Sequence, residues 1–206
     1  MTPKRLLRRA LHAAGLEVTR YPPRIPWGLN HLQDIGRLLA GVPAPTVFDV
    51  GANTGKSVFA FRGALPTCVL HSFEPSPSTF RHLEANTQGL ENVWVVNAGV
   101  GSVPGAQVLI ESKHSTMSSF LRPLQLPRRT VISQTEAAVV LRPAHVAERK
   151  IVGRTEVPVT TLDDYCRAAH VRGIDLLKID TQGYELEVLR GATGLMAANA
   201  IKLIYL

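Results

Sequence analysis

The segment from Thr46 to Ser57 constrains the fold of this chain more than any other stretch. A mostly apolar run, Val47 to Val50, is followed by Gly51, by three further residues and Gly55, and then by a pattern typical of a helix. A short apolar run next to turn residues indicates a buried strand. A strand that passes through glycines into a helix indicates a βα unit whose loop suits an anionic or nucleotide-like ligand.

Strand and helix patterns alternate along the rest of the chain. Short apolar runs indicate strands, and apolar residues three or four positions apart indicate helices. Strands are expected at Thr46 to Val50, Cys68 to Phe73, Val93 to Val96, Val157 to Thr160, Ile174 to Asp180 and Ile201 to Leu206. Helices are expected at Leu29 to Leu39, Lys56 to Leu65, Pro77 to Thr87, Leu162 to Ala169 and Glu185 to Arg190. This order predicts an α/β fold, a doubly wound, Rossmann-like parallel sheet with right-handed crossovers.

Two stretches depart from this alternation. Residues 1–45 combine a basic helical segment with a proline-rich linker at residues 21–26, since prolines cannot continue a helix. Residues 101 to 155 mix prolines and arginines without clear regular structure, apart from a strand suggested at Gln107 to Ile110. We interpret this insertion as a variable cap over the site. The chain is therefore expected to consist of an N-terminal segment, residues 1–45, and one domain, residues 46–206.

The excess of basic residues has a distinct distribution. The chain carries 23 Lys and Arg against 16 Asp and Glu, a formal net charge of +7. Lys4, Arg5, Arg8 and Arg9 alternate with leucines, which predicts a basic amphipathic helix. Such a helix suits weak contact with an anionic membrane surface, although a plain solvated helix is the simpler interpretation.

Composition narrows the class of protein further. No apolar run approaches the roughly 20 residues of a membrane-spanning helix, and Cys68 and Cys166 show neither a disulfide framework nor metal-ligand spacing. We therefore expect a cytoplasmic protein with no metal site. The arginine-rich stretch at residues 122–150 contains no aromatic residue, which disfavours nucleic acid as a partner. Its arginines are interpreted as solvated surface or as contacts with an acidic substrate.

The spacing of the glycines distinguishes between nucleotide classes. Gly55-Lys56-Ser57 resembles the end of a P-loop, but the required glycine five positions before Gly55 is absent. A dinucleotide site requires Gly-x-Gly-x-x-Gly, whereas this loop has Gly-x-x-x-Gly. The arrangement instead suits a nucleoside amino acid, with Asp49 near its cationic amino group. Glu74, at the end of the second strand, is placed to accept hydrogen bonds from ribose hydroxyls.

Candidate catalytic residues follow the later strands. Asp180 ends the strand that begins at Ile174, and the two-residue strand period puts it on the same face as Lys178. We take Asp180 as the base or acceptor-orienting group and Lys178 as the partner of its charge, with a helix cap as the alternative role of Asp180. His114 is a second candidate base, or else a solvated loop histidine. His71 is expected to pack.

Four motifs together resemble the FkbM-type methyltransferases. They are Val47 to Asn53, Ser72-Phe73-Glu74-Pro75, Thr161-Leu162-Asp163 and Lys178 to Glu185. The resemblance covers about Thr46 to Leu206 and implies a class I methyltransferase fold that binds S-adenosylmethionine. Asn97 and Ala98 then lie where relatives approach the adenine ring, with a turn asparagine as the alternative. Gln182 departs from the pattern, because many relatives carry glutamate there.

The resemblance implies a set of site residues and an activity. The expected cofactor-binding residues are Asp49, Gly51, Asn53, Gly55, Ser57, Glu74, Pro75, Asn97 and Ala98. The implied activity is O-methylation of a sugar, glycolipid or polyketide-like acceptor. Sheets of this class end with an antiparallel β-hairpin, and the sequence to Leu206 has no residues for it. A catalytically inactive cofactor-binding or partner-binding module therefore stays an alternative, and a nucleic-acid methyltransferase is a weaker one.

Overall fold

The computed structural model describes residues 26–121 and 151–206. The predicted basic N-terminal helix, most of the proline-rich linker and the arginine-rich stretch lie outside the described residues. The chain divides into two compact units, one ending at Leu38 and the other running from Leu39 to Leu206. The described part of the first unit contains the helix α2, His31–Leu38, which confirms the helix predicted there. The Asn30 side chain begins it by accepting a hydrogen bond from the Gln33 N–H at 3.1 Å.

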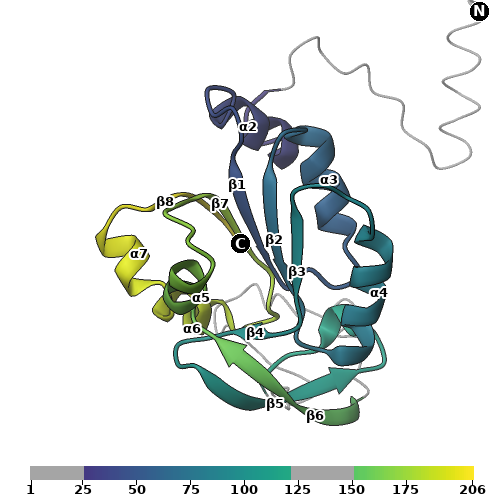
Figure 1. The fold of residues 1–206 in the computed structure, drawn as a ribbon. Coiled ribbons are helices and arrows are strands. Elements are labelled where there is room, and N and C mark those ends of the chain that lie inside the picture. Colours follow the sequence, from purple (N-terminus) through teal and green to yellow (C-terminus); the bar gives the residue numbers. More distant parts are fainter. Residues whose placement is uncertain (1–25, 122–150) are drawn as a thin grey trace, which may run out of the picture. The chain divides into compact units, whose positions relative to one another are not determined.

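The second unit is built on a five-stranded parallel sheet (Figure 1). The strand order is β3-β2-β1-β7-β8, and every neighbouring pair is parallel. The strands are β1 Thr46–Val50, β2 Val69–Phe73, β3 Val93–Val96, β7 Ile174–Ile179 and β8 Ile201–Tyr205. Each coincides with a predicted strand to within one residue. The sheet has no antiparallel strand in the described part of the chain.

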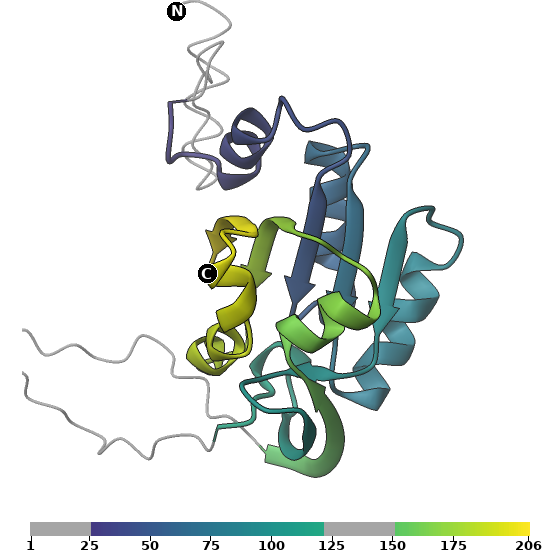
Figure 2. The ribbon, with the colours of Figure 1, turned by 60° about the vertical axis from the view of Figure 1, so that its left-hand side comes forward.

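Helices cover both faces of this sheet (Figures 1 and 2). On one face lie α3, Lys56–Ala64, and α4, Pro77–Thr87; on the other lie α5, Leu162–Ala168, α6, Glu185–Arg190, and α7, Thr193–Ala197. The predicted doubly wound α/β fold is therefore confirmed. The helix predicted from Pro77 to Thr87 is confirmed as well; the Ser76 hydroxyl caps it by accepting a hydrogen bond from the Thr79 N–H. No helix among the described residues is long and apolar enough to cross a membrane.

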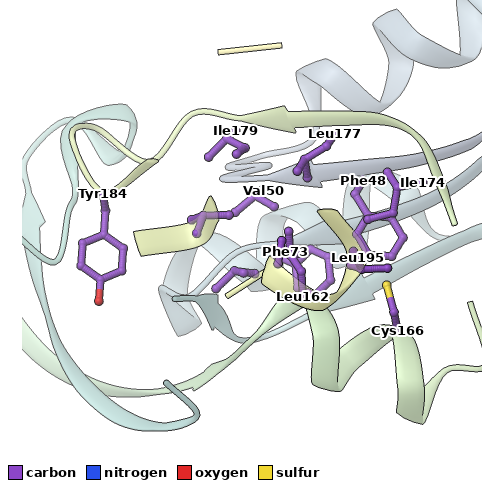
Figure 3. Close-up of a cluster of buried hydrophobic side chains, with 13 residues drawn as sticks. Phe48, Val50, Phe73, Leu162, Cys166, Ile174, Leu177, Ile179, Tyr184 and Leu195 are labelled. Atoms are coloured by element: carbon purple, nitrogen blue, oxygen red, sulfur yellow. The ribbon is translucent and has the colours of Figure 1, made fainter. Parts of the chain in front are cut away.

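One face of the sheet carries the main apolar core (Figure 3). Cross-strand register places Phe48 beside Leu177, and Val50 beside both Phe73 and Ile179. These side chains pack against residues of α5, α6 and α7 and are almost completely buried. Since strand side chains alternate between faces, Asp49 must point to the opposite side of the sheet, toward α3.

A second, three-stranded sheet corrects the expectation of an irregular cap. It has the order β4-β6-β5, formed by β4, Gly99–Val100, β5, Gly105–Ser112, and β6, Ile151–Thr160. β5 and β6 are antiparallel and pair from Gly105 with Val159 to Ser112 with Ile151. The short 3₁₀ helix η1, Ser115–Met117, follows β5. Much of this sheet is solvated, so its polar residues concealed the strand pattern; its pairing also joins segments far apart in the chain.

His71 packs in the domain, as the sequence indicated. Its Nδ1 atom lies 2.8 Å from the Tyr165 hydroxyl oxygen, and its ring stacks on Trp94 with a centroid distance of 5.1 Å. Burial lowers the pKa of His71 to about 4, from an ordinary value of 6.5. The neutral form is therefore the one that the folded protein favours.

The low pKa of His71 predicts a pH-dependent contribution to stability. This contribution is fully present above pH 6.5 and is lost as the pH falls toward 4, by up to about 3 kcal/mol. The substitution H71F should remove it, so that the free energy of unfolding falls less between pH 6.5 and 4 than in the parent. Urea denaturation at several pH values measures this difference. H82F, at an exposed position of α4, is the matched control; equal pH dependence in H71F and the parent would contradict the assignment.

Candidate functional site

A pocket opens at the carboxyl ends of the parallel strands. Its walls come from the turns that follow β1, β2, β3 and β7, and from a segment after β5. The lining residues are Val50, Gly51, Asn53, Phe73, Glu74, Pro75, Ala98, Gly99, Val100, Leu109, Ser115, Thr116, Ser118, Ser119, Phe120, Asp180, Thr181 and Gln182. The carboxyl edge of a doubly wound sheet is where ligands bind in this class of fold.

The glycine loop after β1 contains positive φ angles, which glycine adopts readily and most other residues adopt rarely. Gly51 has φ +81°, and a Cβ atom there would lie 2.1 Å from the Asp180 carbonyl oxygen. Gly55, at the N-terminus of α3, has φ +91°, and Asn53 has φ +50°. The N–H groups of Gly51 and Ala52 both donate to the Phe73 carbonyl. The loop is thus folded tightly against β2 and β7, and Gly51 and Asn53 line the pocket.

Glu74 lines the pocket directly after the end of β2. Its two carboxylate oxygens accept hydrogen bonds from the N–H groups of Asn53, at 3.0 Å, and Ser76, at 2.9 Å. Burial raises the pKa of Glu74 to about 7, and Asp49 adds to the rise; the two N–H groups and the Lys178 ammonium oppose it. A carboxyl group that titrates near neutrality beside a pocket is a candidate functional group.

The third turn is held by Asn97. Its side-chain amide donates to the carbonyl oxygens of Glu74 at 2.8 Å and Pro75 at 3.2 Å. Asn97 does not line the pocket, whereas Pro75 and Ala98 do. The structure therefore places Asn97 as a support for the turn after β2, and it leaves Ala98 as the small side chain in the wall.

Lys178 does not hold the charge of Asp180, so the predicted pairing was wrong. Its ammonium nitrogen lies 2.9 Å from Asp49 Oδ1 and donates to the Gly51 carbonyl at 2.9 Å. Asp49 is paired with Lys178 directly across β1 and β7 and is fully buried. Its Oδ1 atom has no well-oriented hydrogen bond, so the contact with Lys178 is mainly coulombic. Asp49 and Lys178 share a face of the sheet only through tertiary pairing, which the spacing of residues along one strand does not reveal.

Asp49 also contacts Ser57, which was likewise expected to bind the cofactor. Asp49 Oδ2 accepts a hydrogen bond from the Ser57 hydroxyl, at the start of α3. Neither residue lines the pocket, and neither does Gly55. The side chains of Asp49 and Ser57 hold the loop through their contacts with each other and with Lys178.

Asp180 lines the pocket and is exposed. Its Oδ1 atom accepts a hydrogen bond from the Gln182 amide at 2.8 Å. It does not cap α6, because the residue before that helix is Tyr184. The Glu185 carboxylate instead accepts hydrogen bonds from the N–H groups of Thr181 and Gly183, each at 3.0 Å. The alternative role of Asp180 as a cap is thereby contradicted.

A closing segment, residues 115–120, completes the pocket. Ser115 donates from its hydroxyl to Asn53 Oδ1 at 3.2 Å, and the Ser119 hydroxyl bonds the carbonyls of Thr181 and Gln182 at 3.3 and 3.0 Å. The segment therefore spans from the turn after β1 to the turn after β7. His114, just before it, is exposed and does not line the pocket, contrary to expectation.

Sequence reasoning missed the hydroxyl groups of this segment. The polar run at residues 112–119 was the signal available in the sequence, and its histidine was chosen as the candidate. Four of its hydroxyl-bearing residues line the pocket instead. Phe120 and Leu109 gave no signal, since apolar wall residues resemble core residues in sequence. Within the described residues, no group of three or more His, Cys, Asp or Glu is placed to hold a metal ion.

The fold is a doubly wound α/β domain. Its pocket is lined by the glycine loop after β1 and by an acidic residue, Glu74, after β2. A family model described as the Methyltransferase FkbM domain matches residues 49–206. The chain therefore belongs to the FkbM methyltransferase family.

Three curated relatives are similar over most of this chain. Methyltransferase sdnD of Sordaria araneosa is 29% identical over 79% of this chain and 64% of its own length. The 31-O-demethyl-FK506 methyltransferase FkbM of Streptomyces tacrolimicus is 27% identical over 72% and 60%. Methyltransferase 1 of Beauveria bassiana is 26% identical over 70% and 57%. The chain thus spans 57% to 64% of the length of these relatives.

The buried Asp49–Lys178 pair predicts that substitutions at these two positions have non-additive effects on the free energy of unfolding. K178M should destabilise the domain by about 3 to 5 kcal/mol, because it leaves a carboxylate buried without its counter-charge. D49N should also destabilise it, and the double variant D49N/K178M should lose less than the sum of the two. Urea denaturation of the four proteins gives the coupling. K202M, which removes a solvent-exposed lysine from Asp175, serves as the control; additive effects at 49 and 178 would contradict the pairing.

Proposed function

We propose that this chain is an S-adenosylmethionine-dependent O-methyltransferase that acts on a hydroxyl group of a sugar, glycolipid or polyketide-like acceptor. Membership of the FkbM family supports methyl transfer. One structural observation carries the rest of the proposal: Asn53, Glu74 and Ala98, from the turns after three adjacent parallel strands, surround a single pocket with Asp180.

The residues around the pocket suit S-adenosylmethionine. Each oxygen of Glu74 accepts one backbone N–H and keeps a lone pair, so the carboxylate can also accept hydrogen bonds from two neighbouring ribose hydroxyls. The tight turn at Gly51 allows the backbone to come close to the amino acid part. Ala98 leaves space for the flat adenine ring. Asp49, Ser57 and Asn97 are proposed to hold these groups in place without touching the cofactor.

Asp180 is proposed to act on the acceptor. S-Adenosylmethionine supplies a methyl group on a positively charged sulfur, and a hydroxyl acceptor must lose a proton on receiving it. Asp180 can accept this proton on Oδ2, because Gln182 already donates to Oδ1 and fixes the carboxylate plane. Gln182 is therefore a positioning residue, and an amide at this position adds no second negative charge beside the base.

The acceptor class is supported by the part of the pocket wall that comes from β5 and the closing segment. Ser115, Thr116 and Ser118 line the pocket next to the apolar residues Leu109 and Phe120. Such a mixture can bind a polyol or an oxygenated ring system. The Streptomyces relative is named for a demethylated oxygen of FK506, which agrees with a hydroxyl acceptor.

The proposed role of Glu74 predicts pH-dependent cofactor binding. Because only the ionised carboxyl accepts both ribose hydroxyls, the dissociation constant of S-adenosylmethionine should rise as the pH falls below about 7, by up to about tenfold per pH unit. E74Q should bind at least tenfold more weakly and lose this part of the pH dependence. Isothermal titration calorimetry from pH 6 to 8 measures both, with E84Q on the exposed side of α4 as control. No binding by the parent chain would refute the cofactor assignment.

The proposed role of Asp180 predicts a catalytic defect without a binding defect. D180N should lower kcat by about 10² to 10⁴, the range for loss of a general base, and leave the affinity for S-adenosylmethionine unchanged. Q182A should lower kcat less. Formation of S-adenosylhomocysteine with a panel of sugar and macrolide acceptors provides the assay, and E156Q, an exposed residue of β6, is the control. Full turnover by D180N would show that another group accepts the proton.

A further inference from the structure

The first 38 residues carry most of the excess positive charge of the chain. They contain seven Lys and Arg and two Asp and Glu, a net charge of +5, whereas residues 39–206 contain sixteen and fourteen, a net charge of +2. The match to the methyltransferase family begins only at residue 49. The basic charge is therefore concentrated in a unit that the family domain does not include. A charge asymmetry of this kind indicates a separate role in binding an acidic partner.

The described part of this unit also exposes large apolar side chains. Trp27 is 62% exposed, Leu29 is 72% exposed and Leu38, at the end of α2, is 57% exposed. The Arg37 guanidinium group lies over the Trp27 ring, 5.2 Å from its centroid. Positive charge and exposed apolar side chains are the two features that anchor a protein at a lipid headgroup layer. The Arg37–Trp27 contact and the neighbouring leucines combine both.

We propose that residues 1–38 bind the surface of a bilayer that contains anionic lipids. Lys4, Arg5, Arg8 and Arg9 supply the attraction to the headgroups, and Trp27 and Leu29 enter the boundary between headgroups and acyl chains. This attachment is peripheral. It requires no spanning helix, and it does not depend on the methyl-transfer activity proposed above.

The apolar residues favour a membrane over nucleic acid. A positive charge attracts either polyanion, but proteins bind single-stranded bases mainly by aromatic stacking and phosphates by hydrogen bonds. Exposed Leu29 and Leu38 serve neither purpose, whereas a lipid interface shields both from water. Leu6, Leu7 and Leu11, which alternate with the basic residues in sequence, add to the same preference.

Vesicle flotation tests the electrostatic part of the proposal. The full chain should float with vesicles of phosphatidylcholine and phosphatidylglycerol, should not float with phosphatidylcholine alone, and should be released by high salt. The variant R5Q/R8Q/R9Q should bind about 100-fold more weakly, because each basic residue near the surface raises the affinity roughly fivefold. R81Q/R167Q/R172Q, which removes the same charge from exposed positions of the second unit, should bind like the parent.

Tryptophan fluorescence tests the apolar part, because the chain has only two tryptophans, Trp27 and Trp94. In W94F, anionic vesicles should shift the remaining emission to shorter wavelength; in W27F they should not. Equal loss of binding in the two triple variants would overturn the proposal, as would an unchanged spectrum of W94F. Tighter binding to a mixed-sequence RNA than to the vesicles would assign the basic unit to nucleic acid instead. Cofactor binding by calorimetry is a separate readout, so these results leave the proposed enzymatic function untouched.

Discussion

The ion pair between Asp49 and Lys178 is the interaction on which the rest of the domain depends. It joins β1 and β7 near their carboxyl ends, on the face opposite the main apolar core, and both side chains are almost completely buried. Because an unpaired charge in this position would be expensive, the two strands can pair only in the register that brings these residues together. The Lys178 ammonium also donates to the Gly51 carbonyl, so the same contact fixes the glycine loop.

The pocket follows from that register. With β1 and β7 aligned, Gly51 passes so close to the Asp180 backbone that no side chain fits between them. The turn after β2 is then drawn to the loop by the bond from the Asn53 N–H to Glu74, and Asn97 holds that turn from the next strand. Hydrogen bonds between side chains and backbone groups, together with one buried charge pair, therefore hold the turns that form this part of the wall.

The second sheet and the closing segment set the other half of the pocket. β5 and β6 pair over eight residues of β5 and carry the chain to residues 115–120, whose serines bond the turns after β1 and β7. This sheet is also hydrogen-bonded to the turn after β2, since Glu111 of β5 accepts a hydrogen bond from the Ser76 hydroxyl at 2.8 Å. Glu74, whose own oxygens bond Ser76 and Asn53, is thus held by elements of both sheets.

The sequence by itself determined the elements and their order. Strand and helix periods and the glycine turn at Gly51 are local signals, because each depends on residues within one or two turns of chain. Family membership also came from short motifs. Only the tertiary structure decided which charged groups pair, since Lys178 pairs with Asp49 rather than Asp180. It also decided which polar residues line the pocket, since Ser119 does so and His114 does not. Strand register and antiparallel pairing across long separations bring these groups together, and neither is encoded in the spacing of neighbouring residues.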